Sequence, residues 1–126
     1  FNILTKPFEK NLLTKNIDAY NEMRDNLLID PRLGLVPPTL SWLKALNDEL
    51  NKLAKMPPPE IPQLTFLGES DKVISKKAIE NRMARTPMGE LKILSGAMHE
   101  VFFETLDIKE IIWEEIDKFL NKNFPY

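Results

Sequence analysis

The chain has 126 residues, of which 43% are apolar and 29% are charged, a composition typical of a soluble globular protein. This length suffices for one hydrophobic core but not for two ordinary domains. A net charge of -2 is too weak to attract polyanions, so nucleic acid is not expected as a partner. The absence of cysteine and the single histidine exclude thiol catalysis and argue against a zinc site. No metal and no cofactor is expected.

The first residues lack the residue pattern of a signal peptide. The chain begins with Phe1, and no apolar run has the length of a membrane span or the pattern of a signal peptide. We therefore expect a fragment of a longer polypeptide. Its expected location is the cytoplasm, with peripheral membrane contact as the alternative.

The first half of the chain is predicted to be helical. Residues 1–15 are expected to be an extended entry segment around Pro7. Apolar residues then recur at spacings of three and four, which predicts a helix from Asn16 that ends at Asp30 and Pro31. A second helix, capped by Thr39 or Ser41, carries an apolar stripe. The stripe consists of Trp42, Leu43, Leu46, Leu50 and Leu53.

A proline cluster at residues 57–62 is the best boundary in the sequence, because prolines cannot donate backbone hydrogen bonds. It divides the chain into a helical segment, residues 1–60, and a second segment, residues 61–126. In the second segment, strands at 64–67 and 91–94 alternate with helices. The helix between the strands begins near Ser75. The helix after the second strand is expected to be capped by Asp107 and to turn its apolar side chains toward the interior. The inward residues are expected to be Ile108, Ile111, Ile112, Ile116, Phe119 and Leu120.

This order of elements predicts an α/β fold. Two strands joined by a helix form a right-handed parallel unit, so the loops that follow the two strands meet at one edge of the sheet. Ligands in open α/β sheets bind at that edge. The first of these loops contains Asp71, and the second contains His99.

Asp71 and His99 together could form two members of a hydrolytic triad. A carboxylate hydrogen-bonded to one imidazole nitrogen fixes the tautomer and stabilises the imidazolium. Ser70 is a poor nucleophile candidate, because Asp71 and Lys72 follow it where a nucleophile elbow needs other residues. The alternatives without a catalytic role are a surface histidine at position 99 and a helix-capping Asp71. Glu69 is the competing carboxylate for contact with the histidine. An Asp71 oxygen within about 2.6–3.2 Å of the ring is what the catalytic interpretation requires.

The sequence also resembles a known family. Residues 68–74, Gly-Glu-Ser-Asp-Lys-Val-Ile, resemble the acid loop of α/β-hydrolases, and residues 96–104, Gly-Ala-Met-His-Glu-Val-Phe-Phe-Glu, resemble their histidine loop. The second loop is especially similar to the lysophospholipase and monoacylglycerol lipase branch. Residues 11–14, 30–33 and 38–43 resemble the insertion that forms the helical cap of that branch. The resemblance implies the carboxyl-terminal part of an α/β-hydrolase preceded by a cap segment.

The resemblance implies the order serine, acid, histidine, in which Asp71 and His99 match the last two. The nucleophile serine, on a G-x-S-x-G elbow, is then expected upstream of Phe1, in an amino-terminal half that acts as the partner of this chain. The expected reaction is cleavage of an ester in a lysophospholipid- or monoacylglycerol-like lipid. The chain alone is expected to be inactive.

Two alternatives stay open at this point. A serine aminopeptidase would use the same acid and histidine loops, and a non-catalytic helical module would use only an apolar groove for a lipid or a partner. Four residues are candidates for lining an acyl-chain channel, although a stripe at helical spacing more often packs on its own domain. They are Trp42, Leu46, Leu35 and Phe102.

Overall fold

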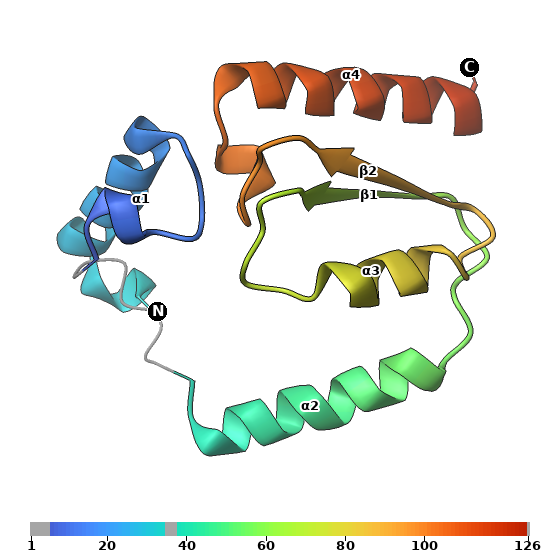
Figure 1. Cartoon of the computed structure of the whole chain (residues 1–126), viewed down its shortest axis with the longest axis horizontal. Coiled ribbons are helices and arrows are strands. Elements are labelled where there is room, and N and C mark those ends of the chain that lie inside the picture. The colour runs from blue at the N-terminus through green and yellow to red at the C-terminus, as the bar shows by residue number, and fades with distance from the viewer. Residues whose placement is uncertain (1–5, 35–37, 126) are drawn as a thin grey trace.

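A pair of parallel strands lies at the centre of the computed structural model, which describes residues 6–34 and 38–125 (Figure 1). The strands are β1 and β2, and helix α3 connects them. Short 3-10 turns precede α1, α2 and α4. The α-helices and strands are α1 (Ile17–Ile29), α2 (Leu40–Lys55), β1 (Gln63–Gly68), α3 (Lys76–Met83), β2 (Gly89–Leu94) and α4 (Leu106–Asn123).

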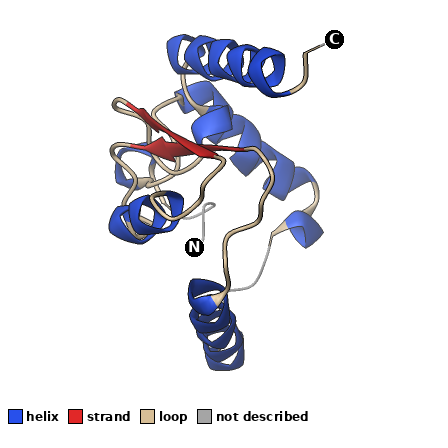
Figure 2. Cartoon of the chain, turned by 90° about the vertical axis from the view of Figure 1, so that its right-hand side faces the viewer, coloured by secondary structure: helices blue, strands red, loops and turns tan. Residues whose placement is uncertain are grey.

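The strands pair in parallel along their whole length, from Gln63 opposite Gly89 to Gly68 opposite Leu94. Helix α3 lies on one face of this sheet and α4 on the other (Figure 2). The core forms under α4, where Leu94 contacts Ile108 and Ile112, all of them buried. The predicted α/β class and the order strand, helix, strand, helix are therefore confirmed.

Three of the predicted helices begin with a capping side chain. The Asn16 side chain accepts hydrogen bonds from the Asp18 and Ala19 amides at the start of α1. Thr39 caps α2, and Ser75 caps α3. Each cap satisfies amides that have no partner within the first turn of the helix.

Three predictions about the helices and the entry segment were wrong. Helix α4 has Thr105 at its N-cap, and Asp107 lies in the first turn, where its charge faces the positive end of the helix dipole. Residues 8–10 form a 3-10 turn, although the entry segment was expected to be extended. On α4, Ile111 and Leu120 are exposed, because two strands cover only the narrow stripe that contains Ile108, Ile112 and Ile116.

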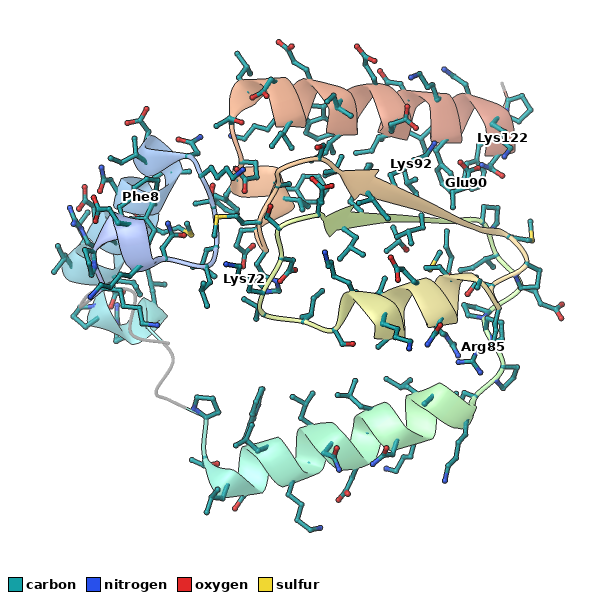
Figure 3. The ribbon with its side chains drawn as sticks, in the orientation of Figure 1. Phe8, Lys72, Arg85, Glu90, Lys92 and Lys122 are labelled. Atoms are coloured by element: carbon teal, nitrogen blue, oxygen red, sulfur yellow. The ribbon has the colours of Figure 1, made fainter. Side chains whose placement is uncertain are left out.

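Ion pairs join the second half of α4 to β2. Lys92 contacts Glu115 at 2.5 Å, and Lys122 donates to Glu90 at 2.7 Å. Figure 3 shows Glu90, Lys92 and Lys122 together between the strand and the helix. The hydrogen bonds from Lys118 and Lys92 lower the pKa of Glu115 to about 2. Because the lysines are largely open to water, these pairs stabilise the contact only modestly.

Helix α2 stands apart from the sheet (Figures 1 and 2). Its whole apolar stripe is open to solvent. Its carboxyl end is held by Arg82 on α3, whose guanidinium donates to the Met56 carbonyl at 2.8 Å and the Leu53 carbonyl at 3.3 Å. This arrangement satisfies carbonyls that the end of a helix leaves without partners. The division into residues 1–60 and 61–126 stays a prediction.

Replacement of Arg82 by alanine is expected to release the end of α2 while leaving the sheet intact. Amide hydrogen exchange at the last turn of α2 should accelerate, and the free energy of unfolding should fall by less than about 1 kcal/mol, because these hydrogen bonds are exposed. Arg85→Ala is the matched control, since Arg85, labelled in Figure 3, donates to the carbonyl of Asn81 on α3 at 3.3 Å. Equal rates of amide exchange in the two variants would show that the hydrogen bonds from Arg82 do not hold the end of α2.

Candidate active site

The loops that follow β1 and β2 lie side by side, as parallel pairing predicts. The Glu69 amide donates to the Leu94 carbonyl at 3.0 Å, and the Ser70 amide donates to the Ala97 carbonyl at 2.8 Å. These bonds continue the strand pairing beyond the sheet and bring the acid loop against the histidine loop. Asp71 and His99 are thereby placed on adjacent loops at one edge of the sheet.

Asp71 and His99 are joined by a hydrogen bond of 2.9 Å between the carboxylate Oδ2 and the ring Nδ1. This distance meets the requirement set by the sequence analysis. The Asp71 side chain is 2% exposed, whereas the His99 side chain is 27% exposed. The carboxylate therefore lies behind the ring, and part of the imidazole remains accessible. The catalytic role of the pair stays a prediction.

The second oxygen of Asp71 is occupied by its own loop. Oδ1 accepts hydrogen bonds from the Val73 amide at 2.7 Å and the Ile74 amide at 3.3 Å. Asp71 thus stabilises the turn of its own loop and also contacts His99. Only Oδ2 remains for the imidazole, and this fixes the direction in which the carboxylate points.

The pKa of Asp71 lies below its ordinary value. Burial raises this pKa, but the hydrogen bond from His99 and those from the Val73 and Ile74 amides lower it by more. Asp71 is therefore ionised at neutral pH and can only accept hydrogen bonds. It follows that His99 donates from Nδ1, which leaves Nε2 as the ring atom able to accept a proton.

The competing carboxylate, Glu69, has a different task. Its Oε2 accepts hydrogen bonds from the Gly96 amide at 2.9 Å and the Ser95 hydroxyl at 3.0 Å, and these bonds lower the pKa of Glu69. Gly96 has φ of +73°, a conformation that glycine adopts without steric cost. Glu69 therefore stabilises the turn that leads into the histidine loop, and the partner of His99 is Asp71.

Gly68 allows the two loops to approach this closely. A Cβ atom at this position would lie 2.6 Å from the Ala97 carbonyl oxygen and would meet the Met98 carbonyl as well. Both obstacles are backbone atoms, which cannot move aside as a flexible side chain would. The last residue of β1 therefore has to be glycine if the histidine loop is to lie against the acid loop.

The four residues predicted to line an acyl-chain channel are not gathered by any described contact. Trp42 and Leu46 lie on the exposed stripe of α2, at 53% and 40% exposure, and Leu35 lies outside the described residues. The ring of Phe102 packs edge-on against Phe66 and lies beside Trp113 of α4, with 52% of the residue exposed. Their role in substrate binding stays a prediction.

Sequence reasoning missed the role of Glu104. This residue is completely buried, and its carboxylate accepts hydrogen bonds from the Met98 amide at 2.8 Å and the Lys15 amide at 3.1 Å. In the sequence, Glu104 is the last residue of the segment that resembles the histidine loop, and no role in the site was predicted for it. The available signal was a carboxylate placed directly after the apolar residues Val101, Phe102 and Phe103, since buried charges occur where polar partners satisfy them.

In the described residues, no three histidine or acidic side chains gather in a way that could hold a metal ion. Every helix in the same part of the chain falls short of the length and apolar content that a membrane crossing requires.

The chain is similar to known proteins in both sequence and fold. The chain is 29% identical over 93 residues to a Haemophilus influenzae protein named "Probable lysophospholipase L2", a match that covers 73% of this chain and 30% of that protein. The fold is similar to a soluble variant of monoglyceride lipase from Saccharomyces cerevisiae, solved with a substrate analog. That match has a TM-score of 0.65 and 18% identity, and covers 94% of this chain and 43% of the lipase. No family model matches.

Replacement of Gly68 by alanine is expected to push the histidine loop away from the acid loop. The added methyl group would meet backbone oxygens, so the free energy of unfolding should fall by about 2–3 kcal/mol, the upper range for overpacking. Gly34→Ala is the control, because the nearest atoms to a Cβ there lie at 3.3 Å. Chemical denaturation of both variants measures the difference. A Gly68→Ala protein as stable as Gly34→Ala would contradict the close approach.

Proposed function

The chain resembles the carboxyl-terminal part of α/β-hydrolases of the lysophospholipase and monoglyceride lipase type, and from this premise we propose that it carries the acid and the histidine of a serine hydrolase. The substrate is an ester of a lysophospholipid- or monoacylglycerol-like lipid. The observation that carries the proposal is the 2.9 Å hydrogen bond between buried Asp71 and partly exposed His99, at the ends of two parallel strands.

In the proposed reaction, the nucleophile is a serine outside this sequence, on an elbow of the kind that α/β-hydrolases use. His99 Nε2 accepts the proton of the serine hydroxyl as the oxygen attacks the ester carbonyl carbon. The imidazolium then returns that proton to the leaving alcohol, and the acyl group stays on the serine. In the second half, the same nitrogen takes a proton from water as the water oxygen attacks the acyl carbon. The imidazolium then gives this proton to the serine oxygen as the acyl–serine bond breaks, which releases the fatty acid. Asp71 holds the ring and stabilises its charged form throughout.

The proposed substrate class rests on the relatives and on the composition of α2. The similar proteins are named as a lysophospholipase and a monoglyceride lipase. The exposed stripe of α2, which includes Trp42 and Leu46, provides apolar surface suited to an acyl chain. An aminopeptidase remains the alternative within this class, because an acid and a histidine do not by themselves select the scissile bond. Assays with monoacylglycerol, lysophospholipid and peptide substrates would separate these activities.

The proposed partner is the remainder of the hydrolase. The chain spans 30% of the length of the similar lysophospholipase and 43% of the similar lipase. In the described residues β1 and β2 pair only with each other, so each strand presents one open edge, and Ile93 of β2 is 53% exposed. The missing strands, the serine and the oxyanion hole would come from that remainder. A cytoplasmic location, with peripheral membrane contact as the alternative, belongs to the same proposal and can be checked by fractionation of cells.

The function is tested by labelling of the full-length protein with a fluorophosphonate probe, which reacts with activated serines. Labelling should be lost in His99→Asn. In Asp71→Asn it should slow by about 10³–10⁴-fold, because an amide in place of the carboxylate favours the wrong tautomer of the imidazole. Asp107→Asn, a matched loss of a carboxylate on α4, should label like the parent. Labelling that persists in His99→Asn would contradict the proposal. A parent protein that is not labelled would also contradict it and would favour a non-catalytic binding module.

The open sheet edges predict that this chain in isolation associates with itself, because unpaired strand edges are templates for further pairing. Size-exclusion chromatography with light scattering should show oligomers whose proportion falls on dilution. Ile93→Lys should reduce the association by placing a charge on the exposed face of β2. Ile61→Lys, outside the strands at an equally exposed position, should not. A monomer at all concentrations would contradict the proposed interface.

A further inference from the structure

Glu104 is a buried carboxylate that the proposed reaction does not use. It follows the 3-10 turn η3 (Val101–Phe103), and none of its surface is exposed to solvent. In the described part of the chain, it forms no ion pair with a lysine, arginine or histidine side chain within 4.0 Å. Burial of a carboxylate is costly unless hydrogen bonds satisfy it, so the role of Glu104 has to be sought in the hydrogen bonds that it accepts.

The two oxygens of Glu104 hold two backbone amides from distant parts of the sequence. Oε1 accepts from the Met98 amide at 2.8 Å, and Oε2 accepts from the Lys15 amide at 3.1 Å, 89 positions away from Glu104. A carboxylate is the group suited to this task, because both of its oxygens accept and neither must donate. Glu104 therefore joins the segment before α1 to the histidine loop.

The same two segments are joined by further hydrogen bonds. The Glu100 amide donates to the Leu13 carbonyl at 2.8 Å, and the Thr14 hydroxyl donates to the Phe103 carbonyl at 2.8 Å. The amides on either side of His99, those of Met98 and Glu100, are thus both held. The backbone that carries the imidazole is fixed from its two neighbours, while Asp71 fixes the ring itself.

We propose that Glu104 is a positioning residue of the active site, which holds the Met98 and Lys15 amides so that the His99 ring meets the Asp71 carboxylate. The catalytic consequence rests on the proposed function, whereas the effect on the His99 ring does not. A merely structural carboxylate would alter the stability of the protein and leave the ring hydrogen bond unchanged.

The test is Glu104→Gln in the full-length protein, since glutamine has the same shape but presents an NH₂ group to one of the two amide donors. Histidine is labelled with ¹⁵N, and the His99 signal is assigned by its absence from His99→Asn. We expect exchange of the Nδ1 proton with water to accelerate by about tenfold, the factor that corresponds to loss of one hydrogen bond to a charged group. Ester hydrolysis should show a similar fall in kcat with little change in KM.

Thr86→Val is the control for a general loss of stability. Thr86 is nearly as buried, at 5% exposure, and its hydroxyl donates to the Arg82 carbonyl at 3.0 Å, away from the histidine loop. This variant should lose stability without a change in His99 proton exchange. Thr14→Val, which removes the bond to Phe103, should show a smaller effect in the same direction as Glu104→Gln, and it replaces that variant if glutamine prevents folding.

The outcomes separate this proposal from the hydrolase proposal. Unchanged His99 proton exchange in Glu104→Gln, or in Thr14→Val where that variant replaces it, would overturn the positioning role, even if the parent reacts with the fluorophosphonate. A parent protein that does not react, with exchange still accelerated in the variant, would support positioning and remove the hydrolase assignment.

Discussion

The parallel pairing of β1 with β2 is the constraint from which the rest of the structure follows. Parallel strands end at the same edge of a sheet, so two loops far apart in sequence emerge together. The acid loop and the histidine loop then continue the pairing through the bonds from Glu69 to Leu94 and from Ser70 to Ala97. An antiparallel pair would place Asp71 and His99 at opposite ends of the sheet, and no side-chain interaction could recover their contact.

Three carboxylates stabilise these loops by the same means. Asp71 accepts the Val73 and Ile74 amides, Glu69 accepts the Gly96 amide, and Glu104 accepts the Met98 and Lys15 amides. In each case backbone amides satisfy oxygens of the carboxylate, so the loops are held in place by hydrogen bonds to their own main chain and to that of Lys15.

The exposed apolar surface has a simple cause. Helices α2 and α4 carry apolar faces wide enough for a larger sheet, whereas two strands cover only part of one of them. The stripe of α2 is open along its length. On α4, about half of the surface of Ile111, Trp113 and Leu120 is exposed, whereas Ile112 is buried. Surfaces of this extent are typical of an interface or a binding site. They agree with a chain that spans less than half of its similar lipase.

The sequence by itself determined the features that depend on neighbouring residues. Apolar periodicity and capping side chains are local, so α1, α2, α3 and both strands could be predicted, as could the caps at Asn16 and Ser75. The order of strand, helix and strand was sufficient to expect Asp71 and His99 on adjacent loops. Only the tertiary structure decided which carboxylate contacts the ring, how much of α4 the sheet covers, and what Glu104 does. These outcomes depend on contacts across the chain, such as that between Lys15 and Glu104, and such contacts leave no periodic pattern in the sequence.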